Sequence, residues 1–327
     1  MPRINDEMLD CVFYLYRSRD AAEKGEESGG TGFWVAHTSH KVKNLSIIYA
    51  VSNKHVVASS GCSVIRVNTI DGGIDTFEVE PHEWHFTNQD DLAIIPIRIS
   101  FNKHIVKTLP LDMFVTSDVM EYHDLGLGDE VFMIGRFIKH DGKLTNIPSV
   151  RFGALSIPVA DMPHQMFGVQ ESFGVEMRSM GGYSGSPVFI YPSSWNMNSG
   201  IVKTVSPNPL FLLGVDWGHI VDALEIKEKI VTTSAQGSSQ ARTVPYVPAN
   251  TGMNGVVPAW RLLKMIQRSP WAPSFKREED AIAKRENDAG PTVALDVASL
   301  ASDDNPDHRE DFTALLNAAV RKPQSKD

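Results

Sequence analysis

The sequence has little cysteine: Cys11 and Cys62 are the only two among its 327 residues. A fold that depends on a framework of disulfides is therefore excluded. Neither cysteine lies in a cluster with metal-ligand spacing, so no metal or other cofactor is expected. We expect both cysteines to be buried, unbridged thiols.

Basic residues and long apolar runs are scarce as well. Lys and Arg number 31 against 40 Asp and Glu, which gives a net charge of −9 and no positive excess to neutralise nucleic acid. The first 20 residues interrupt their apolar stretch with charges, so neither a signal peptide nor a membrane span is expected. We expect a cytoplasmic chain that binds neither nucleic acid nor a membrane.

What the sequence does contain is a series of short runs rich in β-branched and aromatic residues, separated by Gly, Pro, Asn, Asp or Ser. No helical pattern alternates with these runs, which predicts an all-β barrel or sandwich. With 42% hydrophobic residues, the chain can bury a sizeable core in one large or two smaller domains. The runs lie at residues 11–17, 32–37, 46–52, 62–69, 91–99, 130–137, 186–192 and 210–217.

Three further segments have a different composition. Residues 21–30 are charged and glycine-rich, which indicates a surface loop, and the polar stretch 232–243 indicates a flexible excursion. A short helix at 258–268 is expected to close the domain, since Pro258 suits a first helical position. The apolar face of this helix contains Leu262, Leu263 and Ile266.

Residues 273–327 are dominated by charge and are expected to form a tail outside the domain of residues 1–272. Within the tail, an apolar stripe that includes Phe312 predicts a helix at about 306–320. Such a stripe either docks on its own domain or binds a protein partner.

The densest chemical signal is GGYSGSPVF at 181–189, where a serine lies between small residues just before an apolar run. Glycine lets the backbone approach a substrate carbonyl closely. Ser184 could therefore present its hydroxyl while the N–H groups of Gly182 and Ser184 face a developing oxyanion. An ordinary Gly/Ser-rich turn would explain the same residues, so the motif needs partners.

A serine nucleophile needs a base, usually histidine, and the base needs an acceptor that orients it. His55 follows an apolar run that ends in small and polar residues, where a strand gives way to a turn. Asp91 begins the apolar run DLAIIPI, and strand alternation would point the neighbouring Asp90 to the opposite side. The order His, Asp, Ser along the chain is that of the chymotrypsin arrangement.

Several motifs in this order resemble trypsin-like serine peptidases, and the resemblance covers most of residues 9–268. The branch that the sequence resembles is the HtrA/Deg-type bacterial group, without a PDZ domain. The matching segments are GTGFWV (30–35), VSNKHVV (51–57), DLAIIPI (91–97), GDEVFMIGRF (128–137), VRFGALS (150–156), GYSGSP (182–187) and NGVVPAWRLLKMI (254–266).

The resemblance implies the chymotrypsin fold: two Greek-key β-barrels, at about 9–118 and 119–257, with the closing helix after them. It implies a serine endopeptidase that hydrolyses a polypeptide substrate through an acyl-enzyme intermediate. In that mechanism Ser184 is the nucleophile, His55 the general base and Asp91 the group that orients His55. Gly182 and Ser184 would supply the oxyanion hole.

The sequence departs from the family pattern at three points. Tyr183 stands where the digestive enzymes carry an aspartate that pairs with a newly cut N-terminus, so activation through that ion pair cannot operate. Ser186 replaces the second glycine of the usual serine motif, a change that the family tolerates. After Trp271 only 56 residues remain, which is too short for a PDZ module.

Specificity is expected to depend on two segments. By resemblance, the base of the substrate pocket lies near Arg178, and Asp216, Trp217 and Gly218 form the wall along which substrate pairs. An Arg178 that faces the pocket would favour an acidic side chain before the scissile bond. An Arg178 at a strand edge would instead point to solvent.

Two alternatives to an endopeptidase remain open. The domain could be a binding or scaffold module in which catalysis is dispensable, with partners recruited through the helix near Phe312. It could also be an esterase that uses the same triad on an exposed acyl pocket. The unaltered His55, Asp91 and Ser184 favour an active enzyme over the scaffold.

Overall fold

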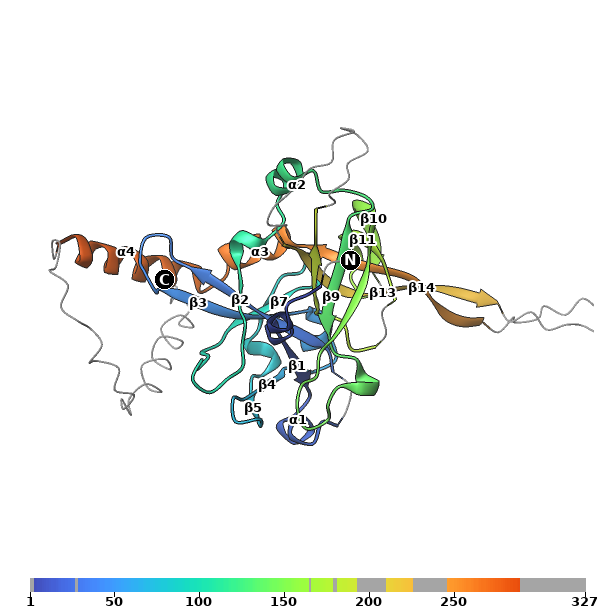
Figure 1. Ribbon diagram of the computed structural model, residues 1–327, viewed down its shortest axis with the longest axis horizontal. Helices are drawn as coiled ribbons and strands as arrows, with labels where there is room; N and C mark the ends of the chain where they lie inside the picture. The colour runs from blue at the N-terminus through green and yellow to red at the C-terminus, as the bar shows by residue number, and fades with distance from the viewer. Residues whose placement is uncertain are drawn as a thin grey trace, which may run out of the picture.

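A computed structural model describes residues 3–26, 29–164, 166–178, 181–192, 210–225 and 246–288 (Figure 1). The polar stretch 232–243 and the helix expected at about 306–320 lie outside these residues. The regular secondary structure of the described chain is mainly β-strands, which form two sheets. Each of the short runs recognised in the sequence overlaps one of these strands, and further strands lie between the runs.

The first sheet has eight strands, in the order β5-β4-β1-β2-β3-β7-β6, with β8 paired in parallel to β2. The other neighbours are antiparallel. Strand β1 is buried along its whole length, and β2 and β4 along most of theirs, which explains their nearly continuous apolar sequence. The strands are β1 (Val12–Tyr16), β2 (Thr31–Thr38), β3 (Ser46–Ser52), β4 (Val64–Asn68), β5 (Ile74–Phe77), β6 (His85–Phe86), β7 (Ala93–Pro96) and β8 (Leu109–Pro110).

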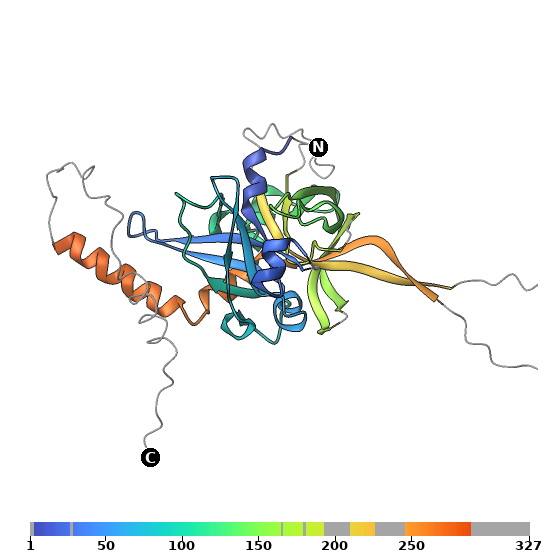
Figure 2. The same cartoon turned by 90° about the horizontal axis from the view of Figure 1, so that it is seen from below.

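The second sheet is a closed barrel in the order β10-β11-β14-β13-β12-β9. Its long hairpin β13–β14 projects away from the barrel in both views (Figures 1 and 2). Two β-domains of this kind are consistent with the two-barrel chymotrypsin fold and confirm the expected fold class. The strands are β9 (Glu130–Gly135), β10 (Ser149–His164), β11 (Gly168–Met177), β12 (Pro187–Ile190), β13 (Phe211–Glu225) and β14 (Tyr246–Pro258).

The helices lie outside the sheets, and none in the described part of the chain is long and apolar enough to cross a membrane. Helix α3 lies within the expected range 258–268, and its N-cap is Pro258. The helices are α1 (Arg19–Lys24), α2 (Ser117–His123), α3 (Ala259–Gln267) and α4 (Ala272–Asp288).

Helix α1 corrects the expectation of a surface loop at 21–30. The hydroxyl of Ser18 accepts a hydrogen bond from the Ala21 N–H at 3.2 Å and so caps the helix. Ala21 and Ala22 are buried against the first sheet. Composition indicated a loop because residues 21–30 are mostly charged residues and glycines, and two alanines gave no clear apolar pattern.

Helix α4 occupies the start of the segment that was expected to be a tail. Its residue Glu279 accepts a hydrogen bond from the Ser39 hydroxyl at 2.6 Å, and Asp280 pairs with Lys41 at 2.7 Å. Phe275 packs on the His37 ring with centroids 4.7 Å apart. These contacts place α4 along the end of the β2–β3 hairpin (Figure 2).

One apolar cluster joins the two domains. Burial of each large apolar side chain stabilises the fold by about 1.5–3 kcal/mol, so this shared cluster holds the domains in one arrangement. Its members include Phe33, Val51 and Ile94 from the first sheet, Phe132, Phe189 and Leu212 from the barrel, and Leu262 and Ile266 from α3.

A second link between the domains is polar and centres on Arg66 of β4, which is fully buried. Its guanidinium donates to the carbonyl oxygens of Ala22 at 2.8 Å and Lys143 at 2.6 Å, and to Asn146 Oδ1 at 2.8 Å. The guanidinium also lies 4.6 Å from the ring centroid of Tyr16. Arg66 therefore fastens the loop after β9 to the first sheet.

We predict that Arg66→Met lowers the free energy of unfolding by about 3 kcal/mol, because several buried acceptors lose their donor. Urea denaturation measures the change. Arg17→Met is the matched control, since Arg17 is exposed and its Nε donates to the Ser60 carbonyl at 3.1 Å. A loss in Arg66→Met no larger than in the control would contradict the assigned role.

Candidate active site

His55 stands just after β3, at the first residue of a single π-helical turn, His55–Ser59. Asn53 holds this corner, because its side-chain amide donates to the Asp91 carbonyl at 2.8 Å. The His55 N–H donates to Asp91 Oδ1 at 2.9 Å. Hydrogen bonds from the Asn53 side chain and from the His55 N–H thus connect the end of β3 to Asp91, in the segment before β7.

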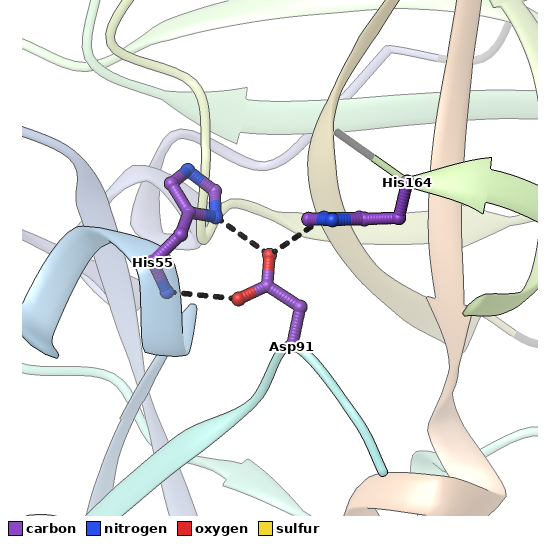
Figure 3. A group of neighbouring side chains, drawn as sticks. All are labelled: His55, Asp91 and His164. Atoms are coloured by element: carbon purple, nitrogen blue, oxygen red, sulfur yellow. Dashed lines mark hydrogen bonds and ion pairs between the residues drawn. The ribbon is translucent and has the colours of Figure 1, made fainter. Parts of the chain in front are cut away.

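The structure brings together His55 and Asp91, two of the residues that the sequence motifs singled out. His55 Nδ1 lies 2.6 Å from Asp91 Oδ2 (Figure 3). Asp91 is fully buried, and this burial would raise the pKa of its carboxyl. Hydrogen bonds from His164 and His55 outweigh the burial, so the pKa lies below its usual value and the group is an anion.

Asp90 binds other partners than Asp91, although both residues lie in the bend before β7 and not in a strand, as strand alternation would require. Its Oδ1 accepts hydrogen bonds from Arg261 Nε at 2.8 Å and from Gln170 Nε2 at 3.1 Å. Adjacent aspartates therefore serve different partners: Asp91 contacts His55, while Asp90 ties α3 and β11 to the first sheet.

Ser184 lies in a tight loop before β12 whose backbone requires glycine at two places. Gly182 has φ +103° and Gly185 φ +88°, in the region that L side chains rarely adopt. A Cβ on Gly182 would lie 2.7 Å from the Arg136 carbonyl oxygen, and one on Gly185 would lie 2.1 Å from the Thr31 carbonyl oxygen. The motif's glycines are therefore needed for the loop's shape.

Thr31 of β2 connects this loop to the first sheet. Its hydroxyl donates to the Gly182 carbonyl at 2.7 Å, and its N–H donates to the Ser184 carbonyl at 2.9 Å. The hydroxyl also accepts from the Arg136 N–H at 2.9 Å. Thr31 therefore fixes both carbonyls that flank Tyr183.

The N–H groups of Gly182 and Ser184 have no acceptor among residues 181–192 or elsewhere in the described part of the chain. Two unpaired donors beside a serine hydroxyl are what an oxyanion hole requires. The carbonyl of Gly182 cannot compete for the hole, because Thr31 already binds it.

The serine and the histidine line one cleft of about 180 Å³ between the domains. The Ser184 hydroxyl donates to the Trp217 carbonyl at 3.4 Å and makes no hydrogen bond to His55 in the described structure. Arg178 is exposed after β11 and does not line the cleft, so it gives no pocket base for an acidic side chain. The lining consists of His55, His164, Met166, Gly181, Tyr183, Ser184, Asp216, Trp217, Gly218 and His219.

Tyr183, which replaces the aspartate of the digestive enzymes, points into the barrel and is buried. Arg151 Nε donates to its hydroxyl at 2.9 Å, and the hydroxyl also contacts the Ser149 hydroxyl. The Tyr183 carbonyl accepts from the Ser186 N–H at 2.8 Å. The residue therefore anchors the loop to β10.

His164 is a member of the site that sequence reasoning missed. It is the last residue of β10, and its Nε2 lies 3.2 Å from Asp91 Oδ2, opposite His55 (Figure 3). Its ring also packs on Trp217 with centroids 4.5 Å apart. No local motif surrounds His164, and only the closed barrel brings it to Asp91.

His55, Asp91 and His164 each offer one ligand atom, and these atoms lie within 4.8 Å of one another. The 2.6 Å between His55 Nδ1 and Asp91 Oδ2 is a hydrogen-bond distance, shorter than the separation of two ligands on one metal ion. Asp91 Oδ2 lies within hydrogen-bond distance of both rings, so a hydrogen-bonded group accounts for the cluster.

Asp216 lies in β13 on the cleft wall and is fully buried. Burial raises the pKa of its carboxyl to about 7, although Asn254 Nδ2 donates to it at 2.7 Å and His55 is near. The charge of Asp91 raises the value further. The pKa of Asp216 thus lies well above the ordinary value of an aspartate, on the same cleft as His55.

No protein-family model matches this chain, and no curated protein matches it. Among solved structures, the MamO protease domain from Magnetospirillum magneticum is 16% identical with a TM-score of 0.42, over 80% of this chain and 98% of that one. The Rv3671c protease from M. tuberculosis in its active form is 16% identical with a TM-score of 0.41, over 79% and 78%. At these levels the matches carry no argument about activity or individual residues.

We predict that Asp216→Asn stabilises the protein more at pH 8 than at pH 5. The folded-state pKa of about 7 lies above the ordinary 3.8, so the native chain loses stability as pH rises from 3.8 through 7, and the loss is complete above that. Asparagine keeps an oxygen for Asn254 and removes the buried charge. Scanning calorimetry should show a melting temperature a few degrees higher at pH 8 and a smaller gain at pH 5.

The exposed Asp161 provides the control: Asp161→Asn should leave the melting temperature nearly unchanged at both values of pH. An Asp216→Asn gain that is equal at pH 5 and pH 8 would show that the carboxyl does not change ionisation in this range.

Proposed function

We propose that the chain is a serine endopeptidase in which Ser184 is the nucleophile, His55 the general base and Asp91 the orienting acid. The observation that carries the proposal is the 2.6 Å contact between His55 Nδ1 and a buried, ionised Asp91, with His55 and Ser184 on one cleft. The substrate is a polypeptide that lies along the cleft between the two β-domains.

The resting hydroxyl of Ser184 bonds to the Trp217 carbonyl at 3.4 Å, so it rotates about Cα–Cβ to reach His55 Nε2 when substrate binds. Catalytic hydrogen bonds are often long in the free enzyme and tighten in the complex. The serine oxygen then attacks the scissile carbonyl while its proton passes to His55. The imidazolium that forms is stabilised by Asp91.

The negative charge of the tetrahedral intermediate lies on the former carbonyl oxygen, which the Gly182 and Ser184 N–H groups face. His55 returns its proton to the leaving amine, the C–N bond breaks and an acyl-Ser184 ester remains. Water then repeats the sequence: His55 takes its proton, hydroxide adds to the ester, and Ser184 is released with its proton restored. Asp216, Trp217 and Gly218 form the wall beside which the substrate backbone lies.

A fluorophosphonate probe tests the nucleophile. We expect the native chain to be labelled once, at Ser184, and Ser184→Ala to lose the label, as intact-mass spectrometry would show. Ser186→Ala is the matched control, since Ser186 is a buried serine of the same loop, and labelling should persist. An unlabelled native chain, or a label that survives in Ser184→Ala, would reject the mechanism.

A comparison of variants at Asp91 and Asp90 tests which aspartate orients His55. Asp91→Asn should lower kcat by about 10⁴-fold, because the amide favours the wrong His55 tautomer. Asp90→Asn should reduce kcat by less than about tenfold, since Asp90 contacts Arg261 and Gln170 instead. Turnover of a fluorogenic peptide measures both. Similar losses in the two variants would show that the roles are not divided in this way.

A further inference from the structure

His164 reaches the site from the second domain, at the tip of the β10–β11 hairpin. It pairs in register with Gly168, and only the hairpin turn separates the two. The side chain is buried, with 3% exposed, and its Nε2 faces Asp91 Oδ2 at 3.2 Å (Figure 3). A second histidine thus shares the carboxylate that His55 uses.

The tautomer of His164 follows from its other nitrogen. Nδ1 accepts hydrogen bonds from the N–H groups of Met166 at 3.1 Å and Phe167 at 3.2 Å. A nitrogen that accepts cannot carry a proton, so the hydrogen of the neutral ring is on Nε2. Nε2–H therefore donates to Asp91, and the backbone of the hairpin turn holds it in that state.

The hairpin holds Asp91 from a second side. Gln170 of β11 accepts the Asp91 N–H at 2.9 Å through Oε1, and its Nε2 donates to Asp90. The main chain of Asp91 is thus fixed by one arm of the hairpin and its carboxylate by the other. The hairpin turn also lies against the first domain, where Lys54 Nζ is 5.2 Å from the Phe167 ring centroid.

We infer that His164 is a positioning residue for the proposed reaction: its Nε2–H keeps the buried Asp91 carboxylate ionised and aimed at His55. A fully buried carboxylate needs donors to remain charged, and Asp91 has three, of which His164 is the one supplied by the other domain. This inference rests on the proposed peptidase function for its kinetic consequence, whereas the hydrogen bond itself can be tested without activity.

The titratable groups around His164 set the expected pH response. Asp91 and His55 face it from the first domain, and Asp216 and His219 line the same cleft from β13. The Nε2–H of His164 stabilises the charged form of Asp91 and helps to lower the pKa of its carboxyl. Without this donor the buried Asp91 takes up a proton more readily, so activity is lost at a higher pH on acidification.

Two variants distinguish the effect of the His164 Nε2–H donor from the effect of the packed His164 ring. His164→Phe keeps an aromatic ring against Trp217 and removes both nitrogens, and His164→Gln restores an N–H near the position of Nε2. His104→Phe is the matched control, because His104 is also buried and its Nε2 lies 3.0 Å from Asp75 Oδ2 in the first sheet. Urea unfolding of each variant checks that the comparison is made on folded protein.

The first measurement is NMR of the full-length chain. Nitrogen-15 correlation spectra of the histidine rings should show His164 as the Nε2–H tautomer at neutral pH. The downfield proton between His55 and Asp91 should shift in His164→Phe, move back towards its native position in His164→Gln and stay in place in His104→Phe. A His164 ring protonated on Nδ1, or a His55 resonance indifferent to His164→Phe, would overturn the inference.

The second measurement is peptide hydrolysis against pH. In His164→Phe we expect kcat to fall by about tenfold or more, the size of one hydrogen bond to a charged group, with KM little changed. The acid limb of the profile should move to higher pH, and His164→Gln should recover most of both effects. Native activity retained in His164→Phe with an unmoved acid limb would overturn the positioning role.

The two proposals fail in different ways. If the native chain is neither labelled nor active while the NMR signals respond as expected, the peptidase function is wrong and the His164–Asp91 bond stands. If the native chain is active and His164→Phe matches it in kcat and pH profile, the peptidase stands and the role of His164 is wrong.

Discussion

The hydrogen bonds to the Asp91 carboxylate are the interactions on which the arrangement of the site depends. Asp91 is fully buried, so its charge is stable only while donors surround it. His55 approaches from the end of β3, and His164 approaches from the end of β10. Because the donors come from both β-domains, the hydrogen bonds around Asp91 are complete only when the two domains pack together.

The same logic applies to the serine loop. Thr31 belongs to the first sheet, yet it binds the carbonyls of Gly182 and Ser184 in the second domain. The apolar cluster beneath brings the sheets together, and these directional bonds set where the serine and the flanking N–H groups lie. Nonpolar packing therefore determines how the two sheets lie against each other. A few buried hydrogen bonds determine the geometry of the site.

The sequence predicted the parts of this protein that depend on local patterns. The strand runs, the turn at His55, the glycine loop at Ser184 and the contact of Asp91 with His55 rest on short-range rules and on motif order. His164 could not be found in this way, because its role arises from a closed barrel that returns β10 to the first domain. For Arg178 the sequence left two positions open, the base of a pocket or a strand edge facing solvent, and the residue is exposed after β11. Helix α1 was missed because its burial is visible only against the sheet.

The anchoring of Tyr183 has a consequence for how such a protein is regulated. In enzymes that mature by cleavage, a new amino terminus must travel to the serine loop and order it. Here the tyrosine hydroxyl is already held by Arg151 and Ser149, and the neighbouring carbonyls are held by Thr31. In the proposed peptidase, these contacts hold the described part of the serine loop without a newly cut amino terminus.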